Sequence, residues 1–265
     1  QPDLVVLMFT NNDVWYNAQP RYWRGCKPLF QLHGDSLLLT NVPVPRWKDA
    51  CRPDDVRIDA EEKSAFQRIK DWFRVRFRLY TLASRAVENT AWLHRLAIEA
   101  GAVPVPPETS MESGSVAPIP EEFAVYKKTD STPEVVESWQ TTKALLRRMK
   151  HLTEESKAAL VAFYIPSRGS IYQDEWEATR SKYGLTADEW DMLEVARNLL
   201  KICAEESIAC IDPSERFVSA GEQLAEDGER LYYEIDGHWN PNGHRLAAEM
   251  LAEYVVADMI SKAAR

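Results

Sequence analysis

Three apolar runs, separated by stretches with helical periodicity, constrain the fold of this chain more than any other feature. Residues 3–10 (DLVVLMFT) and 158–166 (AALVAFYIP) are continuous and carry β-branched side chains, and residues 207–212 (SIACID) form a shorter run. Such runs are typical of parallel strands that are covered on both faces. The stretches with helical periodicity are residues 62–100, 133–151, 186–206 and 241–262. This alternation predicts a three-layer α/β/α sandwich around a parallel sheet.

Local signals refine this prediction. Thr132-Pro133 marks the start of one helix, and Thr186 with Glu189 three positions later forms a capping box at the start of another. Residues 101–130 are rich in Pro, Ser and Glu, so we expect a long surface loop there. The helix between residues 60 and 88 carries seven basic side chains. We interpret them as a solvated outer face, with contact to an anionic membrane or to a partner as the alternative.

Composition excludes several classes of protein. The 265 residues suit one large α/β domain or two small ones, and the net charge of -9 argues against a nucleic-acid partner. No apolar run is long enough to cross a membrane, and the start has no signal-peptide pattern. Because the chain opens almost directly on a buried strand, we expect it to be the interior of a longer gene product.

The sequence has four cysteines, Cys26, Cys51, Cys203 and Cys210. They form no Cys-x-x-Cys pair, and their spacing leaves their redox state open.

The segment YYEIDGHWNPNGHRLAAEML, residues 232–251, holds the most informative chemistry. Asp236 and His238 are two residues apart, directly before an amphipathic helix that begins near Pro241. A carboxylate beside an imidazole suits a catalytic dyad, because the carboxylate fixes the ring tautomer and stabilises the imidazolium. Two alternatives stay open on the residues alone. One is a structural role for both side chains in the turn, and the other is a metal ion bound by these two residues together with His244.

This segment resembles the last block of the SGNH (GDSL-type) hydrolases, in which an Asp and a His near the C-terminus serve a serine nucleophile. The spacing Asp-x-His-Trp resembles that of a bacterial subgroup of the family, which includes the alginate acetylation proteins. The resemblance implies an SGNH or flavodoxin-like sandwich. It also implies an oxyanion-hole Asn in a turn that follows a central strand. Asn12 in LMFTNNDVWYN matches that residue, and Asn11 stands where many members have Gly.

The letters Gly34-Asp35-Ser36-Leu37 spell the family's serine motif, but their context is different. In the family the serine block precedes the Asn block and leads into a helix, whereas Ser36 follows Asn12 and runs into Pro43 and Pro45. Apolar residues on both sides of Gly34-Asp35 predict a β-hairpin instead. Ser167 and Ser170 also lack the glycine-turn-helix context. The nucleophilic serine is therefore expected upstream of Gln1.

The resemblance implies a serine-type acyl ester hydrolase or O-acetyltransferase acting on a saccharide-like or small ester substrate. Asp236 and His238 would be catalytic and Asn12 would serve the oxyanion hole, with no cofactor and no metal ion. The alternative is a catalytically inactive SGNH-like binding module. The four aromatic residues after the Asn turn either line the acyl site or pack in the core; they are Trp15, Tyr16, Tyr22 and Trp23.

The same resemblance bears on organisation and location. We expect a single SGNH-like domain over residues 1–265 that lacks its first strands, with a helical and loop insertion at residues 46–150. A second chain or an N-terminal segment would then complete the sheet. The subgroup favours a periplasmic, secreted or membrane-anchored protein.

Overall fold

The computed structural model describes residues 2–22, 25–34, 36–44, 96, 117–129, 131–235 and 237–263, with side chains up to residue 257. The helix expected at 62–100, apart from residue 96, lies outside the described residues, as do Trp23, Cys51 and Asp236. No helix in the described ranges is both long and apolar enough to cross a membrane.

At the centre of the fold, the described residues form a parallel sheet of three strands, β1 (Leu4–Thr10), β6 (Ala159–Ile165) and β7 (Ala209–Ile211). Their order is β1-β6-β7, and all pairs are parallel, from Leu4 opposite Ala159 to Thr10 opposite Ile165. The three apolar runs of the sequence are therefore the three strands, and the predicted α/β sandwich is confirmed.

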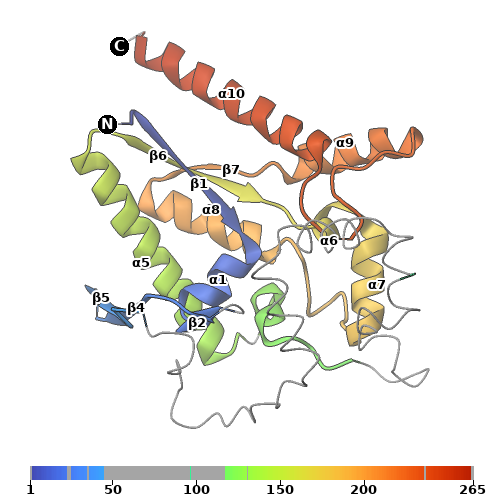
Figure 1. Ribbon diagram of the computed structural model, residues 1–265, viewed down its shortest axis with the longest axis horizontal. Helices are drawn as coiled ribbons and strands as arrows, with labels where there is room; N and C mark the ends of the chain where they lie inside the picture. Colours follow the sequence, from blue (N-terminus) through green and yellow to red (C-terminus); the bar gives the residue numbers. More distant parts are fainter. Residues whose placement is uncertain are drawn as a thin grey trace.

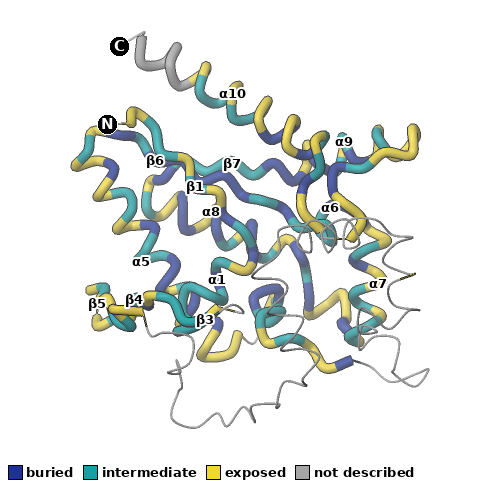
Figure 2. Tube along the Cα trace, in the orientation of Figure 1, coloured by how far each residue is buried: buried dark blue, intermediate teal, exposed yellow. Residues whose placement is uncertain are grey.

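Strand β6 is buried on both faces because side chains of opposite parity enter two separate apolar clusters. Leu160, Ala162 and Tyr164 belong to the larger cluster, and Phe163 belongs to the smaller one. Helices α5 (Pro133–Glu155) and α8 (Glu194–Glu206) contribute to the larger cluster, and α9 (Ser214–Glu226) and α10 (Pro241–Ala263) contribute to the smaller one. The two helix pairs accordingly lie on opposite sides of the sheet (Figure 1). Figure 2 shows the buried residues concentrated along β6 and α8, whereas α10 becomes more exposed away from α9.

Strand β1 corrects one expectation, because it is covered on only one face within the described chain. Val5, Leu7 and Phe9 pack on the larger cluster, whereas Val6 and Met8 on the other face are 37% and 38% exposed. On that side, the smaller cluster joins α9 and α10 to residues of β6 and β7 and includes no residue of β1. In the described residues β1 also pairs on one edge only, with β6.

Two further expectations were wrong. Helix α8 begins at Glu194 and not at Thr186. Residues 187–193 form turns instead, because Trp190 is buried and bridges Lys127 of another segment. The stretch 101–130 is not a surface loop throughout: its end forms the 3-10 helix η2 (Glu121–Tyr126), whose Val125 and Tyr126 are buried in the core.

The remaining described elements are short. Helix α1 (Asn11–Asn17) follows β1, and α6 (Arg168–Ile171) and α7 (Gln173–Tyr183) follow β6. Strands β2 (Arg21–Tyr22) and β3 (Gly25–Cys26) pair with each other, as do β4 (Leu29–His33) and β5 (Ser36–Thr40). A disulfide between Cys203 and Cys210 links α8 to β7.

Candidate active site

A cavity of about 570 Å³ lies where β1 and β6 end, which is the edge at which open parallel sheets bind ligands. Most of its surface is apolar, with polar side chains from two distant parts of the chain. The lining residues are Met8, Thr10, Asn11, Asn12, Tyr126, Ile165, Pro166, Ser167, Tyr232, Gly237, His238, Trp239 and His244. The cavity thus brings together Asn12 and His238, which are far apart in the sequence.

Asn12 is positioned by the junction between β1 and α1. Thr10 is the N-cap of α1, and its backbone N–H donates to Asp13 Oδ2 at 2.7 Å in a capping box. Burial raises the pKa of the Asp13 carboxyl, and the Thr10 hydrogen bonds partly offset this. The Thr10 hydroxyl donates to Asn12 Oδ1. The Asn12 amide nitrogen is therefore turned away from Thr10, on an exposed residue at the cavity wall.

His238 is carried by a loop that folds back on itself between α9 and α10. The Tyr233 N–H donates to the His238 carbonyl at 2.8 Å, and Tyr232 forms an isolated antiparallel bridge with Trp239. Gly237 has a φ of +70°, a conformation that side chains rarely adopt, so this position favours glycine. Asp236, the predicted orienting carboxylate, lies outside the described residues.

The loop is joined rigidly to the start of α10. Asn240 Oδ1 accepts the N–H groups of Asn242 and Gly243 at 2.9 and 3.2 Å, as an N-cap does. Its Nδ2 donates to the Arg230 carbonyl at 2.6 Å, and its backbone N–H donates to the Leu231 carbonyl at 2.9 Å. One side chain therefore ties both ends of the His238 loop to the helix.

Arg168 of α6 attaches the same loop to helices α6 and α7. Its guanidinium donates to the carbonyls of Tyr233 and Glu234 at 3.1 and 2.5 Å, and it pairs with Glu175 of α7. Glu175 also binds Arg230 at 2.9 Å. The two arginines and Glu175 form a charged clamp at the base of the loop.

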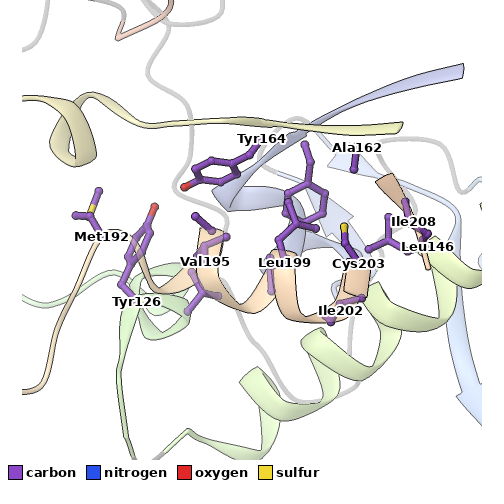
Figure 3. Packing of buried hydrophobic residues seen from close by; sticks show 14 of the residues in the cluster. Tyr126, Leu146, Ala162, Tyr164, Met192, Val195, Leu199, Ile202, Cys203 and Ile208 are labelled. Atoms are coloured by element: carbon purple, nitrogen blue, oxygen red, sulfur yellow. The ribbon is translucent and has the colours of Figure 1, made fainter. Parts of the chain in front are cut away.

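The hydroxyl of Tyr164 lies beneath the cavity and donates to Asn11 Oδ1, on an Asn11 side chain that is only 7% exposed. Burial raises the pKa of Tyr126 to about 12 and that of Tyr164 well above its ordinary value. Both phenols point into the same space between β6 and α8 (Figure 3).

The other candidate serines are placed as follows. Ser36 is the first residue of β5 and pairs with His33 across the hairpin turn, so the hairpin prediction is confirmed. It is not among the residues that line the cavity, and the hairpin is well separated from α10 (Figure 1). Ser167 does line the cavity, whereas Ser170 turns away and donates to the Ser167 carbonyl at 2.8 Å.

The aromatic lining differs from the expected one. Trp15 packs against the larger core cluster, and Tyr16 packs edge-on against Tyr22 at 4.5 Å between ring centroids. None of these three is among the residues that line the cavity, whose aromatic rings belong to Tyr126, Tyr232 and Trp239. The positions of Tyr232 and Trp239 beside the Asp-x-His segment could have signalled this role. Tyr126 had no such signal, because its neighbours are those of a polar loop.

The cavity residues do not form a recognised metal site. In the described ranges no group of three His, Cys, Asp or Glu side chains is arranged to hold a metal ion. Any set that includes Asp236 lies beyond those ranges.

A parallel sheet between helix layers, with Asn and His side chains meeting at its carboxyl edge, defines an SGNH-like α/β domain. The family model described as SGNH hydrolase-like domain, acetyltransferase AlgX, matches residues 125–264, more than half of the chain, so the chain belongs to that family. The match includes His238 and leaves β1 and Asn12 outside. At the level of the family, the chain is an SGNH hydrolase-like domain of the ester-acting hydrolase or acetyltransferase class.

Other comparisons add little. A solved crystal structure is similar to this chain at 16% sequence identity over 51% of this chain and 60% of that chain, with a TM-score of 0.33. Similarity at this level carries no argument. A search of curated proteins finds no match.

Proposed function

We propose that this chain supplies the general base and the oxyanion donor of a serine-type acyl esterase or O-acetyltransferase that acts on a saccharide-like or small ester. The observation that supports this most is that Asn12 and His238 line one cavity. The family adds the class of chemistry, since its description names an acetyltransferase.

In the proposed reaction a serine hydroxyl attacks the ester carbonyl carbon while His238 takes the hydroxyl proton, with Asp236 orienting the imidazole. The carbonyl oxygen becomes an oxyanion, which the Asn12 amide stabilises. The alcohol then leaves with the proton from His238, and the acyl group stays on the serine. Water or an acceptor hydroxyl next attacks this acyl-enzyme. His238 takes the proton of the attacking water or hydroxyl and then gives it to the serine oxygen as the acyl–serine bond breaks. The product is an acid when water attacks and a new ester when an acceptor hydroxyl attacks.

The serine is proposed to come from a segment upstream of Gln1 or from a second chain, packed along β1. Support comes from the exposed Val6 and Met8 on one face of that strand and from its unpaired edge in the described residues. Met8 also lines the cavity, so a segment covering it would lie beside His238.

The test treats this chain and a longer product of the same gene with a fluorophosphonate probe, and locates adducts by peptide mass spectrometry. We expect an adduct on a serine before Gln1 in the longer product, and its loss in the His238→Ala variant. An adduct on Ser36 or Ser167 of this chain would place the nucleophile here instead. If the longer product takes no label, the catalytically inactive binding module becomes the better explanation.

A further inference from the structure

Helices α5 and α8 form a second concave surface that the proposed reaction leaves unused. The two helices lie side by side (Figure 1), and two cavities of about 330 and 190 Å³ lie along them. Three described residues line both cavities: Trp139 and Gln140 of α5 and Asn198 of α8. Because the cavities share these residues, they adjoin and form one groove, which we call the α5–α8 groove.

Trp139 places a flat apolar ring in the middle of this groove. The residue is half-buried, since it packs against the larger core cluster and also lines both cavities. Its Nε1–H has no hydrogen-bond partner among the described residues. It is not a fully buried unpaired atom either, because the one such atom in the described chain is Trp239 Nε1. The polar edge of the Trp139 ring is therefore accessible to a ligand.

Two side-chain amides accompany this ring. Gln140 is exposed, and no described residue forms a hydrogen bond with its amide. Asn198 Nδ2 donates to Glu194 Oε1 at 3.0 Å, and no described residue donates to Asn198 Oδ1. A side-chain amide can donate and accept at the same time, as a hydroxyl group can. The two amides are therefore suited to a ligand that is rich in hydroxyls.

The two carboxylates that line the groove are paired with cations of the protein. Glu194 pairs with Arg197 at 2.8 Å, and Glu205 pairs with Lys143 at 2.6 Å. An unpaired carboxylate would repel an acidic ligand, whereas these paired ones repel it less. The groove therefore accepts neutral and acidic ligands alike.

The groove lies next to the cavity that holds Asn12 and His238. Tyr126 lines that cavity, whereas its chain neighbours Val125 and Lys127 line the groove, and consecutive Cα atoms are only about 3.8 Å apart. This boundary is fixed, because the Asp191 N–H donates to the Tyr126 carbonyl at 3.0 Å. A ligand longer than the groove therefore has the cavity beside it.

We propose that the α5–α8 groove binds a saccharide chain, with Trp139 against a sugar ring and the Gln140 and Asn198 amides on its hydroxyls. A sugar ring combines an apolar face of C–H groups with hydroxyls around its rim, and the indole and the two amides match these two parts. The inference rests on the proposed function for the saccharide nature of the substrate, and it adds a binding site outside the cavity. A chain anchored there raises the effective concentration of its other sugar residues at the neighbouring cavity.

The test measures the dissociation constants of two probes for this chain by isothermal titration calorimetry. Cellotetraose is the neutral probe and tetragalacturonate is the acidic probe, so the pair covers both kinds of saccharide chain. The variants are Trp139→Ala, Gln140→Ala and Arg148→Ala, each checked for folding by circular dichroism. Arg148 is a matched control, since it is exposed on the same helix and is not among the residues that line the groove. Gln140→Ala changes an exposed side chain, so the test stays decisive even where Trp139→Ala disturbs the core.

We expect at least one probe to bind, and its dissociation constant to rise about tenfold in Trp139→Ala through loss of the stacking surface. Gln140→Ala should raise it a few-fold, as for loss of one hydrogen bond, and Arg148→Ala should leave it unchanged. Absence of binding by both probes would overturn the inference, and so would equal affinity in Gln140→Ala and Arg148→Ala. A dimer of the chain that Trp139→Ala dissociates, without binding of either probe, would assign the groove to a second copy instead.

A second measurement separates this inference from the proposed function. In the longer product of the gene, Trp139→Ala and Gln140→Ala should raise KM for acetylated cellotetraose more than KM for p-nitrophenyl acetate. Ester turnover in which both variants change the two KM values equally would retain the proposed function and overturn the groove. Saccharide binding that depends on Trp139 and Gln140, in a product without ester turnover, would retain the groove and reject the proposed function.

Discussion

The position of Gly243 in the first turn of α10 makes a strong test of how the His238 loop is packed. A Cβ atom at this residue would lie 2.4 Å from the Leu231 carbonyl oxygen and 3.0 Å from Trp239 Cβ. The carbonyl belongs to the backbone and is held by the Asn240 N–H, so it does not move as a flexible side chain does. To remove this clash, the loop or the helix has to shift by roughly 1 Å, given ordinary contact distances.

The size of the effect follows from two opposing terms. Overpacking of a buried contact costs about 1–3 kcal/mol, and a clash with backbone belongs at the upper end. Replacing Gly by Ala in a helix stabilises it by about 1 kcal/mol. The net expectation for Gly243→Ala is a loss of about 2 kcal/mol in the free energy of unfolding. For a chain of this size this lowers Tm by roughly 4–8 °C.

The assay is urea unfolding followed by circular dichroism, with Tm from calorimetry. Ala248→Gly on the exposed face of the same helix is the matched control, since it reports the helix-propensity term without a clash. It should lose about 1 kcal/mol. The packing argument is refuted if Gly243→Ala is as stable as the unchanged chain or more stable while the control behaves as expected.

Two other predictions concern the loop and the cavity floor. Arg168→Met should speed amide hydrogen exchange at Tyr233 about tenfold, because the loop loses a donor to two carbonyls, and Arg168→Lys should restore part of the protection. Arg216→Met, which breaks only a surface pair with a glutamate, should leave that exchange unchanged; equal effects of both would contradict the clamp. The raised pKa of Tyr126 means that its folded phenol stays protonated to about pH 12, whereas the unfolded phenol ionises near pH 10. Stability should therefore fall as pH rises through this interval, less steeply in Tyr126→Phe, and parallel curves for both proteins would contradict it.

Much of the fold could be predicted because the central strand is buried on both faces. The run at 158–166 became β6, and it is apolar throughout because each face packs on a different cluster. The run at 3–10 looks the same in sequence, yet one face of β1 is exposed in the described chain. Local hydrophobicity predicts which side chains of a strand are to be buried, but it does not predict which elements bury them.

The misplaced start of α8 has a similar origin. Thr186 and Glu189 have the spacing of a capping box, but the helix begins only at Glu194. Between them Trp190 enters the core and pairs with Lys127, a contact between segments far apart in the sequence. Tertiary packing here outweighs the local signal.

For the candidate site, local context was sufficient to place Asn12 after a strand and His238 before a helix, and both reach one cavity. Their catalytic roles stay predictions. The clamp at Arg168 was not predictable, because its partners in α7 and the loop are brought together only by folding. Tyr126 was concealed by its setting at the end of a Pro- and Ser-rich stretch.

The edge and face of β1 that are uncovered in the described residues have a consequence for the behaviour of this polypeptide in solution. Natural sheets often protect an edge strand with a lysine, a proline or a bulge, whereas Leu4–Thr10 carries no charge at all. Between two copies, repulsion from the net charge of -9 then opposes edge-to-edge pairing. This repulsion reaches only about 8 Å at physiological ionic strength. Salt that leaves the fold intact should therefore promote association of the purified chain, and dilute buffer should preserve single molecules.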